Sequence, residues 1–368
     1  MSTVSDLLYS DTEEALRDSV RRLFADRCPP EAVTSLYDTA PQDFSGVWRT
    51  LAAELGMAGL LVPEELGGAG ATAREAAVVM EEIGRAMAPV PYLSSAVVAT
   101  VALLTAGDTD TVQGLAAGSL TAALAVPLPT APGDPITAVN AGRGGLTGRI
   151  TSVVGVGEAD VLLVPVTGPD GLELHTVARD AAGLDVSPVL SLDMTRPLAN
   201  LVFSGAASSR VGSAPADAAV AAALEAGTAL LASEQLGIAQ WCFETTLGYV
   251  KQRKQFGRAI GSYQAIKHRL ADLWIELNSA AAAARYAADT CARNDADATI
   301  AAAVAQAYCS AAAVHAAEEC VQLHGGLGMT WEYPAHLYLK RAKCDQLAFG
   351  TTYRHRARLA GLVDLPAS

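Results

Sequence analysis

The C-terminal half of the chain contains the segment Arg253-Lys-Gln-Phe-Gly-Arg-Ala-Ile-Gly-Ser-Tyr-Gln-Ala-Ile-Lys-His-Arg-Leu-Ala-Asp272 and, further on, Gln322-Leu-His-Gly-Gly-Leu-Gly-Met-Thr-Trp-Glu-Tyr-Pro334. Apolar residues recur every three to four positions through 239–249, 263–293 and 299–323, so the first segment joins two helices and the second follows a third. The glycines and the proline in these segments set turns. Together they predict long helices that reverse direction and pack as a bundle.

The pattern changes twice along the rest of the chain. Helical spacing runs from residue 11 to about 118, whereas short β-branched runs such as 161–166, 172–177 and 201–203 lie between about 120 and 213. Alanine-rich helical sequence returns at 216. The sequence predicts an α+β protein with an N-terminal helical domain (1–118), a middle β-domain (119–215) and a C-terminal four-helix-type bundle (216–368).

Composition limits the class of protein. The 368 residues carry a formal net charge of −13, which disfavours binding to nucleic-acid phosphates. Residues 1–10 show no secretory pattern, and no stretch has the roughly 20 uncharged apolar residues that a membrane helix needs. We expect a cytoplasmic metabolic protein without a nucleic-acid or membrane partner.

Cysteine and histidine spacing disfavours a metal centre. The six cysteines form no CxxC pair, and the six histidines form no HxxxH or HExxH pair. The cysteines are expected to be reduced core or groove residues, and no metal ligand is predicted.

The two quoted segments, together with Arg341-Ala-Lys343, resemble the flavin-binding signatures of the acyl-CoA dehydrogenases. The order of helical and β regions is also similar to that family from end to end. The resemblance implies the acyl-CoA dehydrogenase fold, FAD as cofactor and an oxidoreductase that introduces a double bond beside an acyl thioester.

In this family the two segments reach the flavin of a neighbouring subunit. By position, Arg253, Phe256 and Gln264 would contact the pyrophosphate and adenine side of FAD, and Gln322, Gly325, Gly326 and Gly328 would close around it. A guanidinium can bind phosphate oxygens, and glycine lets the backbone approach a cofactor closely. Alternatively, Arg253 is a solvated charge and the glycine pair an ordinary helix stop, but the spacing of many residues at once favours the flavin role.

The family's catalytic base has no counterpart at its two expected positions. In most members a glutamate lies in a Tyr-Glu-Gly-Thr stretch, for which this chain has Ala348-Phe-Gly-Thr351, so the position is Phe349, or Gly350 when counted from Arg341. Some members carry the base on an earlier helix, where this chain has Gly227. No catalytic residue is therefore predicted. Glu225, Glu234 and Asp345 lie nearby and are candidates for a displaced base, but each fits a helix-surface charge or an ion-pair partner better.

Contacts to the subunit's own flavin ring and thioester also look eroded. The family's Thr-Glu-Pro-x-x-Gly-Ser-Asp loop corresponds to 126–134 and its Trp-Ile-Thr/Ser segment to 152–155, and neither motif is kept. An arginine that some members carry after the earlier base position is replaced by Thr228. Contacts toward a neighbour's flavin are thus kept while contacts to the chain's own flavin are lost.

The resemblance extends to the base-lacking subunits of actinobacterial heteromeric acyl-CoA dehydrogenases. It implies a heterotetramer with a homologous partner subunit, a steroid side-chain or similarly bulky acyl-CoA as substrate, and electron-transfer flavoprotein as acceptor. Two alternatives are a self-sufficient homotetramer with a relocated base and a non-catalytic structural subunit.

Overall fold

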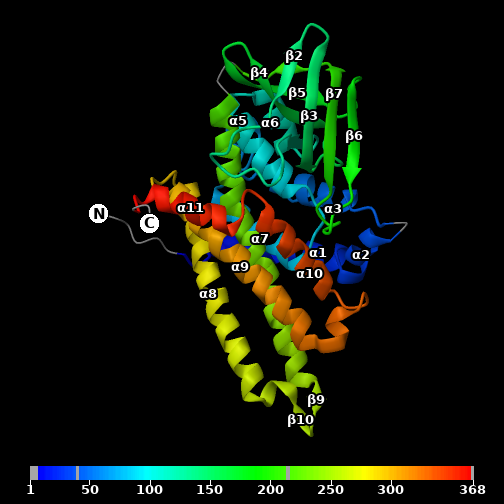
Figure 1. Ribbon diagram of the computed structural model, residues 1–368, viewed down its shortest axis with the longest axis vertical. Helices are drawn as coiled ribbons and strands as arrows, with labels where there is room; N and C mark the ends of the chain where they lie inside the picture. Colours follow the sequence, from blue (N-terminus) through cyan, green and yellow to red (C-terminus); the bar gives the residue numbers. More distant parts are fainter. Residues whose placement is uncertain (1–6, 39–40, 213–215, 366–368) are drawn as a thin grey trace.

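The computed structural model describes residues 7–38, 41–212 and 216–365, and the predicted order of helices, β-domain and helices is confirmed (Figure 1). The N-terminal helices are α1 (Asp11–Arg27), α2 (Pro30–Thr34), α3 (Ser45–Arg49), α4 (Ala73–Ala86), α5 (Thr100–Ala106) and α6 (Thr109–Ala116). The C-terminal helices are α7 (Ala216–Gln252), α8 (Gln264–Ala292), α9 (Ala298–His324), α10 (Ala335–Leu347) and α11 (Thr352–Leu362), with the hairpin β9 (Lys254–Gln255) and β10 (Arg258–Ala259) between α7 and α8.

Capping boxes begin two of the N-terminal helices. The Ser10 hydroxyl accepts a hydrogen bond from the backbone N–H of Glu13, whose carboxylate accepts one from Ser10 N at 2.6 Å. Thr72 and Glu75 form the same arrangement at α4. Each box satisfies backbone donors that the first turn would leave unpaired, so the sequence itself fixes where these helices begin.

The β-domain is one eight-stranded sheet, drawn at the top of Figure 1. Its strands are β1 (Ala122–Leu124), β2 (Val139–Gly142), β3 (Gly145–Val154), β4 (Val161–Gly168), β5 (Gly171–Ala178), β6 (Leu184–Val189), β7 (Leu198–Ala206) and β8 (Ser209–Arg210). The order is β6-β7-β3-β2-β4-β5-β8, with β1 beside β4; β4 pairs in parallel with β1 and β2, and the other pairs are antiparallel. A register shift between Ile150 and Val153 in β3 coincides with a left-handed backbone at Ser152 (φ 56°), which marks a β-bulge.

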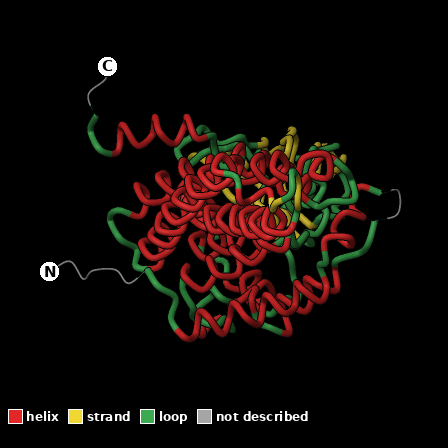
Figure 2. The backbone as a smooth tube through the Cα atoms, turned by 90° about the horizontal axis from the view of Figure 1, so that it is seen from below, coloured by secondary structure: helices red, strands yellow, loops and turns green. Residues whose placement is uncertain are grey.

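Helices α7, α8 and α9 form the body of the bundle. In Figure 2 the helices of the protein fill most of the view, while the strands gather at one side. Alanines on their facing sides, among them Ala232, Ala284 and Ala305, are buried in one cluster. Small side chains allow such helices to lie close together, which explains why an alanine-rich, aromatic-poor sequence forms this bundle.

Two glycines bring the N-terminal domain against the bundle. A Cβ added at Gly84 on α4 would lie 2.0 Å from the carbonyl oxygen of Glu234 on α7, and one at Gly237 would lie 1.9 Å from that of Glu81. Only glycine allows the backbones of α4 and α7 to meet at these points. The contact sets the position of Glu234, whose side chain forms buried ion pairs with Arg196 and Arg341.

By length and composition alone, α7 and the helical stretch Ala298–Met329 could each cross a membrane, but 72% of the most apolar window of each is buried inside the fold. Both are core helices of the bundle.

Candidate functional site

A groove of about 590 Å³ lies where α7 ends, α8 begins and α9 ends. Five of the seven residues that the sequence assigned to FAD line it, namely Arg253, Phe256, Gln322, Gly325 and Gly326. The two segments are far apart in the sequence, so the groove exists only because the bundle brings their turns together.

The β9-β10 hairpin shapes one side of the groove. Phe256 (φ 50°) and Gly257 (φ 80°) are both left-handed and turn the chain between the strands, while Ile260 N donates to Arg253 O at 2.8 Å. This turn leaves the Phe256 side chain 91% exposed. A single exposed ring is ordinary on a protein surface, but this one lines the groove and is accessible to a molecule that binds there.

Arg253 and Arg269 both line the groove, but only one is committed to an internal partner. Arg269 forms a two-pronged ion pair with Glu319 at 2.8 and 2.6 Å. Arg253 is exposed and has no carboxylate partner within the described part of the chain. Its guanidinium is therefore available to an anion that enters the groove.

The glycines after α9 have different roles. Gly325 is left-handed (φ 61°), and a Cβ added at Gly325 or Gly326 would have no heavy atom within 4 Å, so their backbone is open to the groove. Gly328 lies outside the groove lining and is buried, because its missing Cβ would fall 2.4 Å from Val321 O. Gln264 is exposed at the first position of α8 and is also outside the lining.

A stacked wall that sequence reasoning missed closes another side. His324 stacks on Tyr249 with ring centroids 4.3 Å apart, and its Nδ1 donates to Cys320 O at 2.7 Å. The Nε2 atom then accepts from the Tyr333 hydroxyl at 2.6 Å. These contacts fix the orientation of the imidazole, which is buried against the tyrosines at the edge of the groove.

Three segments that the family uses for its own active site also meet, at Leu128. Leu128 N donates to Ser152 O at 2.9 Å, and Leu128 O accepts from Phe349 N at 2.8 Å. The loop 126–134, the segment 152–155 and the stretch 348–351 are therefore adjacent.

Phe349 lies directly over Gly227. A Cβ added at Gly227 would be 2.8 Å from Phe349 Cζ and 3.0 Å from Val98 Cγ2, so the ring occupies the space that a side chain at 227 would need. Phe349 is 3% exposed and has a left-handed backbone (φ 53°). Gly350 instead faces Ala131. Gly227 and Phe349, two positions at which the resemblance places a base, are thus side by side. The space between them holds a phenyl ring and no carboxylate.

We expect this steric fit to appear as coupling between the two positions. Gly227→Ala should lower the free energy of unfolding by about 1–3 kcal/mol through overpacking, and Phe349→Leu by a similar amount through lost packing. In the double variant the smaller side chain makes room for the methyl group, so the loss should fall short of the sum by about 1 kcal/mol or more. Urea unfolding of the four proteins measures the coupling.

Gly248→Ala on the same helix is the matched control, because a Cβ there would meet nothing within 4 Å. It should be neutral or stabilise by up to about 1 kcal/mol. Strict additivity at 227 and 349 would contradict the proposed fit.

Beside the segment 152–155 lies a small cavity of about 20 Å³, lined by Val154, Gly155, Arg196, Glu234 and Arg341 among others. A wider cavity of about 370 Å³ shares Pro89, Pro91, Glu158 and Pro197 with it. A volume of about 10–15 Å³ is what one water molecule requires. The small cavity therefore holds no more than about one water molecule, and charged side chains occupy its wall.

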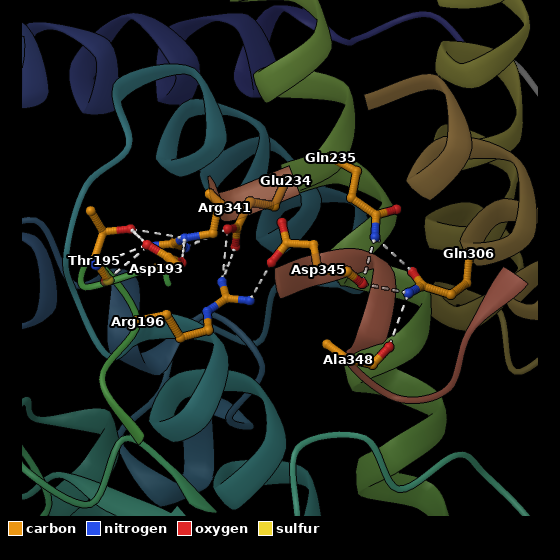
Figure 3. Close-up of polar contacts among 9 residues, drawn as sticks. All are labelled: Asp193, Thr195, Arg196, Glu234, Gln235, Gln306, Arg341, Asp345 and Ala348. Carbon is orange, nitrogen blue, oxygen red and sulfur yellow. Dashed lines mark hydrogen bonds and ion pairs between the residues drawn. The ribbon is translucent and has the colours of Figure 1, made fainter. Parts of the chain in front are cut away.

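These side chains belong to a buried charge network (Figure 3) that joins the β6-β7 loop to α7 and α10. Arg196 binds both carboxylate oxygens of Glu234 at 2.7 and 2.6 Å and Asp345 Oδ1 at 2.8 Å. Arg341 binds Glu234 at 2.6 Å and Asp193 at 2.7 Å. Because all five groups are buried, the network fastens the β-domain to the bundle through ion pairs that solvent does not screen.

The network has three carboxylates and two guanidiniums, which favours one bound proton. Burial, and then the charge of Glu234, raise the pKa of Asp345 well above its usual value, against the lowering effect of Arg196 and Arg341. Asp345 Oδ2 has no hydrogen-bond partner among the residues that the structure describes, so within the carboxyl group only Oδ1 accepts a hydrogen bond, from Arg196.

Asp345 should therefore make the stability of the protein depend on pH. Below about pH 4 both folded and unfolded chains hold the proton, whereas at higher pH the folded chain keeps a proton that the unfolded chain loses. The free energy of unfolding should then fall by up to about 1.4 kcal/mol per pH unit until the folded pKa is passed. Asp345→Asn should flatten this slope above about pH 4 in urea unfolding, whereas Asn at the exposed Asp185 should leave it unchanged. An equal slope in wild type and Asp345→Asn would contradict a proton on Asp345.

The three carboxylates considered as a displaced base were each expected to be a helix-surface charge or an ion-pair partner. In the structure all three form ion pairs. Glu225 pairs with Arg358 on α11. Glu234 and Asp345 are fully buried in the network, so the alternative of a surface charge is wrong for both. Sequence periodicity cannot reveal this, because Arg196 lies 38 and 149 positions away from them.

A model of the acyl-CoA dehydrogenase N-terminal domain matches residues 10–114, and one of the acyl-CoA dehydrogenase C-terminal domain matches residues 218–362. The chain belongs to the acyl-CoA dehydrogenase family of oxidoreductases, whose members are FAD-dependent.

The chain is similar to acyl-CoA dehydrogenases, one of which was crystallised in a two-protein complex. The chain is 37% identical over 334 residues to acyl-CoA dehydrogenase IpdE2 of Mycobacterium tuberculosis, covering 90% of this chain and 91% of that protein. It is 28% identical to a chain of the ChsE4-ChsE5 complex from Mycobacterium tuberculosis, with a TM-score of 0.86 and coverage of 99% and 100%. It is 30% identical to a chain of a variant of the Tcur3481-Tcur3483 steroid ACAD, with a TM-score of 0.83 and coverage of 96% and 98%.

Proposed function

We propose that this chain is one subunit of a heteromeric, FAD-dependent acyl-CoA dehydrogenase, most simply a heterotetramer. It completes the FAD site of a homologous partner subunit and has no catalytic base of its own. This is the family's dehydrogenation of an acyl thioester divided between two kinds of chain.

The observation that carries the proposal is the contrast between two regions. The groove with Arg253, Gln322 and the glycine pair is open, whereas the region around Gly227 and Phe349 is filled. A chain that bound a flavin and a thioester in its own site would need the second region open. A chain that only completes a neighbour's site needs the first.

The groove residues fit part of FAD. Arg253 offers an unpaired guanidinium to the pyrophosphate, and the open backbone at Gly325 and Gly326 allows close approach. FAD, when bound, supplies hydride acceptance from the acyl chain. Removal of the α-proton requires a carboxylate at the reacting carbon, and in this proposal the partner subunit provides it.

The substrate class follows from the relatives. The ChsE4-ChsE5 complex and the Tcur3481-Tcur3483 steroid ACAD combine two proteins, and the second is named for a steroid. We therefore propose a steroid side-chain or similarly bulky acyl-CoA as substrate. Electron-transfer flavoprotein is the acceptor expected from the family.

Mixing tests the proposal. The chain, a homologous acyl-CoA dehydrogenase subunit of the same organism, and the two together would be assayed with a steroid side-chain acyl-CoA and ferrocenium as acceptor. Turnover is expected only in the mixture, and Glu225→Gln in this chain should leave it unchanged. Turnover by the chain alone, lost in Glu225→Gln or Asp345→Asn, would establish a relocated base. If the partner subunit were fully active by itself, this chain would be a non-catalytic structural subunit.

A further inference from the structure

Besides the groove, one surface of the chain gathers large apolar side chains without covering them. The Trp331 patch consists of Tyr37, Leu190, Leu192, Met329 and Trp331, which come from the end of the N-terminal segment before α3, the β6-β7 loop and the turn before α10. Leu190 is 92%, Met329 78% and Trp331 63% exposed. Isolated apolar residues on a surface are ordinary, but a group of this kind favours an interaction site.

Tyr37, which is half-buried, contacts both of the other parts of the patch. The Tyr37 hydroxyl donates to Leu192 O and accepts from Met194 N, each at 3.1 Å, which holds the β6-β7 loop. The Tyr37 ring lies 5.8 Å from that of Trp331 between centroids. Three segments far apart in the sequence are thus fixed together.

Trp331 is also held in place before any partner arrives. Lys340 Nζ lies 4.2 Å from the centroid of the Trp331 ring and 3.8 Å from that of Tyr37, and His336 meets Trp331 edge-on at 4.7 Å. A large aromatic side chain that is exposed yet rigid loses little freedom on binding, which is typical of interface anchors.

The patch adjoins the groove along the chain. Gly325 and Gly326 line the groove, and the same turn, Gly325–Met329, ends in the patch and leads to Trp331 two residues later. On the groove's other side Phe256 is exposed as well. Whatever covers the groove therefore meets apolar surface on both sides, and the proposed function already requires a partner subunit there.

We propose that the Trp331 patch is a docking surface for the homologous partner subunit, with Trp331 as its anchor. The inference rests on the proposed function. It adds a place of contact that is separate from the FAD contacts, so assembly and flavin binding can be tested apart.

The test uses the co-expressed complex at saturating FAD, with dissociation constants from sedimentation velocity over a dilution series. Trp331→Ala is expected to raise the dissociation constant about 30-fold, as for an aromatic hot spot, and Trp331→Phe less than about threefold. Leu190→Asp places a charge on the patch and should weaken assembly like Trp331→Ala. Unfolding midpoints of the isolated variants should match that of the wild type, because these side chains are exposed.

Three outcomes would overturn the docking proposal. Dissociation constants of Trp331→Ala and Leu190→Asp within about threefold of wild type would do so while leaving the proposed function intact, provided that FAD still needs the partner. A self-assembly of this chain alone that these variants break would make a second copy the occupant. Failure of the wild-type chain to form any flavin-containing complex would remove the proposed function, and the docking proposal with it.

Discussion

Arg341→Met is expected to lower the free energy of unfolding by about 3–5 kcal/mol. Arg341 is fully buried and forms ion pairs with Glu234 at 2.6 Å and Asp193 at 2.7 Å, and its Nη2 donates to Thr195 O at 2.8 Å. Methionine has a similar length but no charge. The variant leaves three buried carboxylates with Arg196 as their only cation in the network, and an uncompensated buried charge is costly.

Urea unfolding of Arg341→Met and Lys343→Met at neutral pH measures this effect. Lys343 lies two residues away on α10 and pairs with Glu318 at 2.9 Å, but both partners are well exposed. Its removal should cost less than about 1 kcal/mol, because exposed ion pairs contribute little. Equal losses in the two variants would show that the buried network does not fasten the domains together.

Arg253→Ala is expected to weaken FAD binding to the complex about 10- to 100-fold, which is the effect of losing charge-assisted hydrogen bonds to a phosphate. Arg253 lines the groove, and no carboxylate in the described part of the chain competes for its guanidinium. Its removal should leave the fold intact because the side chain is exposed. The FAD affinity would be measured by flavin fluorescence during titration of the deflavinated complex.

Arg258→Ala is the matched control for this experiment. Arg258 belongs to the same hairpin, but its guanidinium stacks on the Tyr263 ring at 3.8 Å and does not line the groove. It should change the FAD affinity less than about threefold. Unchanged affinity in Arg253→Ala would remove the main contact on which the proposed role depends.

Much of the fold could be predicted because its signals are local. The change from helical spacing to short β-branched runs and back is confirmed by the order of α6, β1 to β8 and α7. The reciprocal approach of α4 and α7 at Gly84 and Gly237 could not be predicted, because both glycines look like weak points within helices until the partner backbone is known.

The candidate site was predictable only where residues carry a motif. Five of the seven proposed FAD contacts meet in one groove, whereas Gly328 packs against Val321 and Gln264 lies outside the lining. Within a glycine-rich segment, spacing cannot distinguish a glycine that faces a ligand from one that allows close packing. The stacking of Tyr249 on His324 and the burial of Arg196 depend on tertiary contacts and have no local signal.

The most direct measurement is the ratio of FAD to chain in this protein purified alone and in complex with its homologous partner, from flavin absorbance and protein concentration. The proposed function predicts a chain that is free of FAD alone and gains it only beside the partner. One FAD per chain in the isolated protein would contradict it, because the chain would then hold a flavin without a partner subunit.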